Sequence, residues 1–314
     1  MKKVLLIPII IGSFLLTAGI TALVFGLSTA RGNKAITNEY KVEAYNDIKI
    51  DISVADLEFK VSEDGQRKVV CEEREKQYHT VEVAGNTLNI KSFDTRKWNE
   101  RIFNFNFKPL RVTIYAPSET YNNANIISST GDVTIPNDFS FNDLKIKLST
   151  GEIDINTNCN KAMNLEVSTG DINVETKTKN LNVTASTGDI SIKNTEIEEK
   201  ISLETSTGKI NLVDVKAQNI DLISHTGNIK LDNTIALKHI NINGHTGDIN
   251  LIDSDADTLD IETTTGDVKG TLLTTKIFNA HSSTGKVDVP DTAAGGICKI
   301  KTTTGDIVIK IKNL

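Results

Sequence analysis

The chain has 314 residues, of which 38% are apolar and only 5% aromatic, and its net charge is −6. Because nucleic-acid-binding domains are typically strongly basic, this acidic balance argues against DNA or RNA as a partner. A core with so few rings must be built mainly from Ile, Val and Leu. Cys71, Cys159 and Cys298 are odd in number and far apart, so they predict neither a disulfide framework nor a metal-binding spacing. Cys298 stands in an apolar column and should be buried.

An almost unbroken apolar run without charge extends from Val4 to Leu27 and follows two lysines. As a helix with a rise of about 1.5 Å per residue, it would cover roughly 36 Å, enough to cross a bilayer. Residues 1–30 are therefore predicted to hold one transmembrane helix and its flanks. The distribution of positive charge places the N-terminus in the cytoplasm and the body of the chain outside it. The alternative is a signal peptide cleaved after Ala30, which would release a secreted protein.

Ten Thr-Gly pairs recur through the rest of the chain, with 18 to 20 residues between successive glycines. The glycines are Gly131, Gly151, Gly170, Gly188, Gly208, Gly227, Gly247, Gly266, Gly285 and Gly305. Val or Ile stands two residues after each of them, and a second apolar residue stands four after, except at Gly270. Further apolar residues stand seven and five residues before the glycines. This period-two alternation predicts one strand on each side of every glycine.

A repeat of 19 to 20 residues is too short for a propeller blade and predicts an all-β solenoid with coils about 4.8 Å apart. The rival arrangement is a series of antiparallel hairpins with Thr-Gly at each two-residue turn. In the solenoid, each glycine supplies a positive φ at a corner. The preceding threonine is expected to point inward, where its hydroxyl would satisfy corner amides.

The same column pattern begins before the first Thr-Gly pair, with Ala55 in the place of the glycine. The solenoid should thus begin near residue 46, and residues 60–120 should form an elaborated N-terminal cap with strands at 81–83, 88–90 and 110–116. The predicted division is an anchor at 1–30, a polar stalk at 31–45, a degenerate first coil and cap at 46–123, and the repeat solenoid at 124–314.

The residue after each glycine should point outward and is usually acidic. Stacked carboxylates at the Asp171–Asp189 and Asp248–Asp267 steps suggest a cation site. However, Lys209 and Lys286 interrupt the column, which favours a solvated ladder of turns.

His225 and His245 occupy one outward position, two residues before the glycine, in adjacent coils. They are weak candidates for a zinc site because no third ligand accompanies them. The rest of this outward column mixes Ser and Thr with the two histidines, which disfavours an ice-binding face. No cofactor or metal is predicted.

The most irregular segment lies in the cap and carries Arg96, Trp98, Arg101 and Phe103. The alternating phenylalanines of Phe103–Phe107 are expected to cover the open end of the first coil. The four residues named first form a possible partner contact, since Trp and Arg are enriched at interfaces.

The repeats leave no room for the long loops that build an enzymatic cleft. No nucleophile elbow, phosphate-cradling loop or intramembrane charge is present in the sequence. The chain is therefore predicted not to be an enzyme.

An N-terminal membrane segment followed by Ser-Thr-Gly-Asp-Ile coils, as at Ser186–Ile190, resembles the bacterial putative-adhesin family of β-strand-repeat proteins over roughly residues 40–314. The resemblance implies a right-handed β-helix-like fold on the cell envelope, sometimes associated with envelope-stress systems, and no catalytic residues. We therefore expect a membrane-tethered, extracytoplasmic scaffold or adhesin-like protein that contacts a cell-wall polymer or surface ligand. The alternative is an accessory protein of an envelope-stress signalling system. A β-helix polysaccharide lyase or hydrolase is less favoured.

Overall fold

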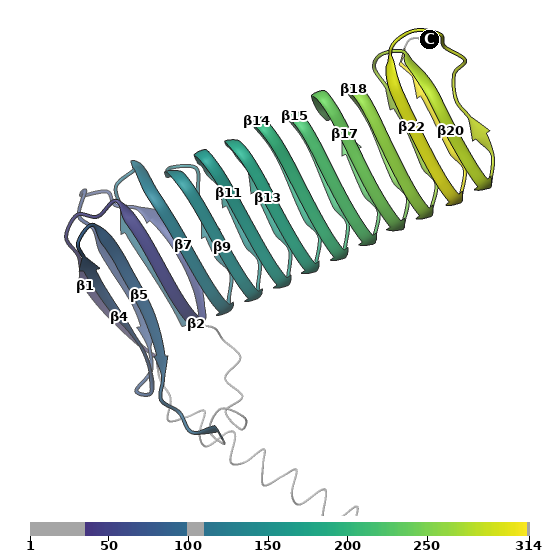
Figure 1. The fold of residues 1–314 in the computed structure, drawn as a ribbon. Helices are drawn as coiled ribbons and strands as arrows, with labels where there is room; N and C mark the ends of the chain where they lie inside the picture. Colours follow the sequence, from purple (N-terminus) through teal and green to yellow (C-terminus); the bar gives the residue numbers. More distant parts are fainter. Residues whose placement is uncertain (1–34, 99–109, 313–314) are drawn as a thin grey trace, which may run out of the picture.

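The computed structural model describes residues 35–98 and 110–312, which form a β-solenoid shaped like a rod (Figure 1). The predicted membrane segment and Phe103–Phe107 lie outside the described residues. Within the described ranges, no helix is long and apolar enough to cross a membrane. The strands pair almost entirely in parallel and in register from coil to coil, which confirms the solenoid. The hairpin alternative is wrong.

The described part of the chain contains 23 strands. The first eight, which form the N-terminal cap and its first coils, are β1 (Ile36–Lys41), β2 (Asp47–Val61), β3 (Lys68–Glu73), β4 (Gln77–Ala84), β5 (Thr87–Asp94), β6 (Leu110–Ala116), β7 (Thr120–Thr130) and β8 (Val133–Ile135). The middle of the rod consists of β9 (Ser140–Thr150), β10 (Ile153–Asn156), β11 (Asn158–Thr169), β12 (Ile172–Glu175), β13 (Lys177–Thr187), β14 (Ile190–Thr207), β15 (Ile210–Thr226), β16 (Ile229–Asp232) and β17 (Ile235–Thr246). The C-terminal end consists of β18 (Ile249–Thr265), β19 (Val268–Leu272), β20 (Lys276–Thr284), β21 (Val287–Asp288), β22 (Gly296–Thr304) and β23 (Ile307–Ile311).

The apolar columns of the repeat form one continuous core along the rod. Ile190, Ile210 and Ile229, each two residues after a corner glycine, stack in register and are almost completely buried. The one-residue variation of the repeat length is absorbed at another corner, where the pairing register shifts, for example between Cys159 and Ala162. An insertion is tolerated there because the buried columns on either side keep their alignment.

The threonine of the Thr-Gly pair is exposed in every repeat, so the prediction that it points inward is wrong. The two residues before each glycine both lie on the outside of the bend. The buried hydroxyl belongs to the residue three before the glycine in several coils. Thr205 donates to the carbonyl of Gly188 at 3.2 Å, and Thr302 donates to the carbonyl of Gly266 at 3.1 Å.

The first coil stacks as the pattern at Ala55 predicts, because Val54 pairs with Thr130 and Leu57 pairs with Val133. On its other side, β2 pairs in parallel with β5 and β6, so a later part of the chain forms the outermost coil. The antiparallel strands β4 and β3 then cover β5 and β6, and β1 completes this end along β3. The parallel stack therefore ends in antiparallel strands, which protects the open end of the rod.

The coils at the C-terminal end do not stack in sequence order. β22 pairs with β18 on one side and with β20 on the other (Figure 1). Likewise, β23 pairs with β19 and with β21. The coil with Gly305 is thus inserted between those with Gly266 and Gly285. The sequence analysis did not anticipate this order.

Gly270, which breaks the apolar column, marks a close approach between coils. A Cβ at this position would lie 2.4 Å from the carbonyl oxygen of Leu251 and 2.6 Å from its Cβ. The missing side chain therefore has a packing explanation.

Candidate binding surfaces

The acidic column after the corner glycines is a hydrogen-bond ladder between coils. The Asp171 carboxylate accepts the backbone amide of Asp189 at 2.7 Å, and the Asp189 carboxylate accepts the amide of Lys209 at 2.7 Å. The same contact joins Asp248 to the amide of Asp267 at 2.9 Å. Each side chain thus pairs a backbone donor in the next coil. The prediction of a solvated ladder of turns agrees with these contacts.

Two positions of this ladder carry lysine, which has no acceptor atom. Lys209 interrupts the ladder inside the rod. Lys286 lies in the coil at its end, where its amide donates to Asp306 at 2.8 Å. Because the coil of Gly285 is outermost, no further amide in the stack requires an acceptor from Lys286. The insertion of the last coil explains why this lysine is tolerated.

The ten corner glycines all have φ between 127° and 151°. They also approach the neighbouring coil closely, since a Cβ on Gly188 would lie 1.9 Å from the carbonyl oxygen of Gly170. These residues shape the surface rather than bind at it. The remaining predicted site residues must be sought on the outward columns.

His225 and His245 are exposed neighbours in adjacent coils, because the following Thr226 and Thr246 pair in register. The imidazole Nδ1 of His245 lies 3.2 Å from the hydroxyl of Thr264. Among the described residues, neither histidine belongs to a group of three potential metal ligands.

The predicted partner contact in the cap is only partly within the described residues, because Arg101 and Phe103 lie outside them. Arg96 forms a two-pronged ion pair with Asp94, with Nε to Oδ1 at 2.9 Å and Nη2 to Oδ2 at 2.6 Å. Trp98 is 73% exposed.

The cap also carries a pair of exposed rings. Tyr78 and Phe93 come from the paired strands β4 and β5, and their rings stack with centroids 5.4 Å apart. Both rings are partly exposed. The sequence analysis did not identify this pair, although the antiparallel pairing of β4 with β5 places Tyr78 directly opposite Phe93.

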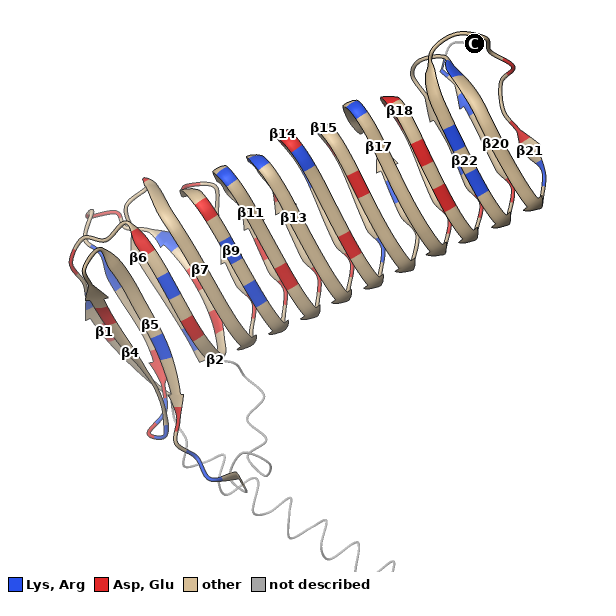
Figure 2. Ribbon diagram, viewed as in Figure 1, with Lys and Arg blue, Asp and Glu red and all other residues tan. Residues whose placement is uncertain are grey.

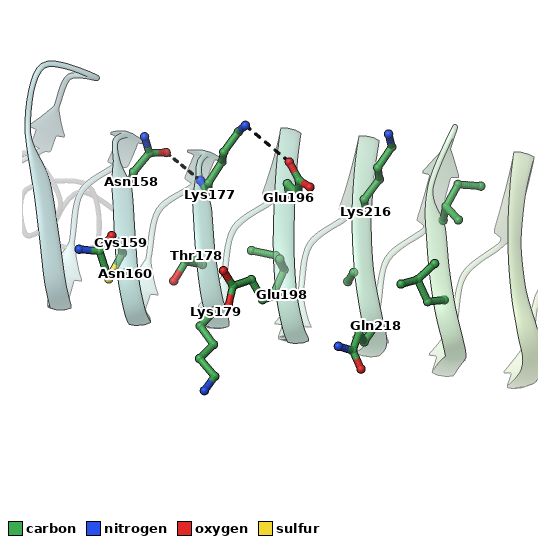
Figure 3. Close-up of a pocket in the computed structure, with 14 residues that line it drawn as sticks. Asn158, Cys159, Asn160, Lys177, Thr178, Lys179, Glu196, Glu198, Lys216 and Gln218 are labelled. Carbon is green, nitrogen blue, oxygen red and sulfur yellow. Dashed lines mark hydrogen bonds and ion pairs between the residues drawn. The ribbon is translucent and has the colours of Figure 1, made fainter.

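A shallow groove of about 580 Å³ crosses β11, β13, β14, β15 and β17 at the corner where the register shifts (Figure 3). Its floor is the buried column that includes Cys159, Thr178 and Ala217. Two rows of outward side chains flank this floor, and Figure 3 shows Lys177 and Lys179 leaving β13 in opposite directions. The groove runs along the rod and is open at the surface.

Two of the three lysines that line this groove form ion pairs with glutamates of the next coil. Lys177 Nζ lies 3.5 Å from Glu196 Oε2, and Lys179 Nζ lies 3.2 Å from Glu199 Oε1. The visible face of the rod likewise mixes both signs of charge (Figure 2). The groove adds the amides of Asn158, Asn160 and Gln218 and, at one end, Leu237, which is 72% exposed. It therefore offers hydrogen-bonding groups and an apolar end with little net charge.

A second hollow of about 530 Å³ lies over the strands that follow the corner glycines. Asn173, Ser191, Asn211, Lys230 and Asn250 line it from successive coils. Its Asn173 amide donates to Glu152 at 2.5 Å, so part of its surface is already hydrogen-bonded. This hollow provides a matched surface for comparison with the groove.

The three cysteines are all buried and free. Cys71 lies beside Glu73 and His79 in the cap, a grouping of the kind found in thiol enzymes. However, burial, together with the Glu73 charge, raises the pKa of the Cys71 thiol to about 12, and burial lowers the pKa of His79. A nucleophilic cysteine needs the opposite shift, toward an accessible thiolate. The burial of the trio and both pKa shifts therefore disfavour a thiol nucleophile here.

Several solved structures resemble the chain. A putative adhesin from Bacteroides fragilis is 20% identical, with 89% of this chain and 97% of that chain covered and a TM-score of 0.43. A putative lipid binding protein from Parabacteroides distasonis is 18% identical, with 89% and 97% covered and a TM-score of 0.44. A putative adhesin from Parabacteroides merdae is 18% identical, with 87% and 96% covered and a TM-score of 0.40.

No curated protein sequence matches the chain. A family model does match it, over residues 45–234 and 213–314, and these two matches span the coils from β2 to the C-terminus. The resemblance to β-strand-repeat adhesin-like proteins is thereby confirmed. The chain belongs to the Toastrack DUF4097 family.

Proposed function

We propose that this chain is a non-catalytic, adhesin-like binding protein of the bacterial cell envelope that holds an extended ligand along its rod. The observation that carries the proposal is the groove over β11 to β17, which crosses successive coils without interruption. A linear polymer that lies along the groove would contact several successive coils at once. Each contact would be weak, but several along one chain would add up.

The chemistry of the groove favours a neutral polymer such as a cell-wall glycan. Lys177 and Lys179 are paired with Glu196 and Glu199, so a strongly anionic chain would have to break these ion pairs in order to bind there. The amide of Gln218 is suited to sugar hydroxyls, and exposed Leu237 offers an apolar contact to a sugar face.

Co-sedimentation with purified cell walls tests this assignment. The variants Gln218→Ala and Leu237→Ser should reduce the bound fraction severalfold, because both side chains line the groove. The variants Asn211→Ala and Lys230→Ala, in the second hollow, are matched controls and should bind as the unmodified chain does. Equal binding by all four variants would refute the groove as the site.

The proposal includes tethering by the apolar segment Val4 to Leu27, with the rod outside the membrane and the N-terminus inside. It also includes the right-handed sense of the solenoid that the family resemblance implies. The uncharged length of the segment supports the tether. Membrane fractions washed with alkaline carbonate should retain the protein, and protease added to intact protoplasts should degrade the rod. Release of a protein that lacks residues 1–30 into the medium would instead support cleavage after Ala30.

A second candidate is an accessory protein that contacts an envelope-stress membrane protein through the cap. The exposed Trp98 and the stacked Tyr78 and Phe93 favour it, because aromatic side chains are enriched at interfaces. Crosslinking in cells followed by purification distinguishes the two. Recovery of a membrane sensor that is lost on Trp98→Ala would support the signalling role, and recovery of cell-wall polymer would support the binding role. A polysaccharide lyase or hydrolase remains a third alternative, which polymer cleavage by the purified protein would reveal.

A further inference from the structure

Three side chains of different ligand types meet inside the N-terminal cap. Cys71 and Glu73 lie on β3, two residues apart and therefore on one face of the strand. His79 lies on β4, which follows β3 after the turn closed by Arg74 and Gln77. All three side chains are buried. The turn thus brings an imidazole onto a thiol and a carboxylate that the strand has already placed side by side.

The spacing of the ligand atoms fits a single bound ion. The Cys71 sulfur, one Glu73 oxygen and one His79 ring nitrogen all lie within 4.8 Å of one another. His79 Nδ1 and Glu73 Oε1 are 3.3 Å apart. Two ligands about 2.0 to 2.1 Å from a tetrahedral ion are separated by roughly 3.3 to 3.4 Å. In the structure these two atoms share a hydrogen bond, and their separation is also the one that such an ion, bound in place of the shared proton, requires.

Neighbouring donors hold the Glu73 carboxylate in place. Asn38 Nδ2 donates to Oε2 at 2.5 Å, and the Tyr40 hydroxyl lies 3.2 Å from Oε1. The backbone amide of His79 also donates to Oε1, at 2.7 Å. Outer partners of this kind fix the orientation of a metal-binding carboxylate. The hydrogen bonds around Glu73 therefore hold its carboxylate in a defined position next to Cys71 and His79.

We propose that Cys71, Glu73 and His79 bind one Zn²⁺ ion inside the cap. The sulfur, nitrogen and oxygen donors suit zinc, whereas calcium and magnesium prefer sites made of oxygen. The proposed ion has three protein ligands and would take a water molecule as its fourth. Because the site is buried and joins β3 to β4, the ion is structural. It fastens the antiparallel strands that close the N-terminal end of the solenoid.

Cobalt provides a direct probe of the site, because Co²⁺ bound to a thiolate gives a charge-transfer band in the near ultraviolet. The full chain, purified in detergent and stripped with a chelator, is titrated with Co²⁺ and then with Zn²⁺. We expect one equivalent of Co²⁺ to develop the thiolate band and Zn²⁺ to remove it. Zn²⁺ should also raise the melting temperature by several degrees.

The variants Cys71→Ala and His79→Gln should lose the thiolate band and the rise in melting temperature. Cys298→Ala removes an equally buried thiol at the other end of the rod and should retain both. A thiolate band in Cys71→Ala, or its loss in Cys298→Ala, would overturn the assignment. If Cys71→Ala fails to fold, the unmodified chain decides alone, because absence of a thiolate band in it refutes the site.

Discussion

The backbone amide of Gly266 donates a hydrogen bond to the carbonyl of Thr304 at 2.9 Å, although 38 residues separate them. In the regular part of the rod, the same bond joins each corner glycine to the threonine of the next repeat, as from Gly247 to Thr265. Gly266 therefore skips one repeat, and the bond from Gly305 to Thr284 completes the exchange. The final strand pair lies inside the stack, where both of its edges are covered.

Charge pairing favours this order over a simple sequence order. β22 presents Lys299 and Lys301 opposite Asp260 and Glu262 of β18, and Lys301 Nζ lies 2.8 Å from Glu262 Oε1 (Figure 2). If β20 stacked there instead, an asparagine and a histidine would face the acidic pair. Opposite charges across paired strands stabilise the pairing, whereas uncompensated acidic neighbours weaken it.

Engineered disulfides should distinguish the inserted order from a simple sequence order. Asp260 and Lys299 are direct partners across β18 and β22, so Asp260→Cys combined with Lys299→Cys should crosslink on oxidation. Asp260→Cys combined with Asn279→Cys should not, because β22 lies between those strands. The mobility shift on a non-reducing gel measures both. The reverse result would establish stacking in sequence order.

Removing one acceptor from the carboxylate ladder should cost a single hydrogen bond. Asp189→Ala deprives the amide of Lys209 of its partner and should lower the free energy of unfolding by about 1 kcal/mol. Asp189→Asn keeps a side-chain oxygen in place, as Asn228 does for the amide of Asp248 at 3.0 Å, and should cost little. Urea unfolding measures both changes. An equal loss in the two variants would mean that charge, rather than the accepted bond, supports the column.

A corner glycine should tolerate no side chain, for two separable reasons. Gly188→Ala would put a side chain on a residue with positive φ and would place a Cβ against Gly170. We therefore expect the free energy of unfolding to fall by roughly 2 to 5 kcal/mol. Gly65 also has a positive φ, of 71°, but nothing lies within 4 Å of its Cβ position. Gly65→Ala should therefore cost only about 1 kcal/mol. Thermal unfolding of the two variants would contradict this account if their losses were equal.

The periodic part of the fold was predictable because each coil repeats the same constraints. The apolar columns and the glycines specify which residues are buried and where the chain turns, and Ala55 showed that the pattern extends into the cap. The order of the last coils was not predictable from the motif, since all ten Thr-Gly pairs have the same local form. What distinguishes them is the pairing of individual charges, such as Lys301 with Glu262, between segments far apart in the chain.

The candidate surfaces were harder to predict than the fold. The alternation of inward and outward side chains along a strand predicted the outward position of His225 and His245. That alternation could not show that a groove forms where the pairing register shifts. The same alternation wrongly predicted an inward threonine beside each glycine, because the bend exposes two successive residues. The sequence analysis considered only the spacing of Cys71 from the other cysteines and so predicted no metal site. In the structure, Cys71 lies beside a glutamate of the same strand and His79 across a turn.

The buried thiol of Cys298 should make the fold sensitive to alkaline pH. Burial raises the pKa of this thiol from 9.0 to about 12. Because the folded pKa lies above the unfolded one, the stabilisation is complete below pH 9 and is lost as the pH rises toward 12. Each pH unit in that window costs up to about 1.4 kcal/mol. Cys298→Val should lose less stability than the unmodified chain when urea unfolding is compared between about pH 8 and pH 11. Parallel losses would show that the thiol does not contribute.

The last coil is also spanned by a buried ion pair between Lys276 and Asp255, whose Nζ and Oδ1 atoms are 2.7 Å apart. Lys276 lies on β20 and Asp255 on β18, with β22 paired between these strands. Lys276→Met would leave a buried carboxylate without its cation, and we expect it to lower the free energy of unfolding by about 3 to 5 kcal/mol.

Adding Asp255→Asn to Lys276→Met should recover part of this loss, because the neutral amide avoids burying an unpaired charge. Lys286→Met is the matched control. At the surface, Lys286 Nζ lies 2.9 Å from Asp288 Oδ2. Replacement of Lys286 should therefore change the free energy of unfolding by less than about 1 kcal/mol. Urea unfolding of the three variants provides the comparison. If Lys276→Met behaved like Lys286→Met, the buried pair would not hold the inserted coil, and the charge pairing of β22 with β18 would have to account for its position.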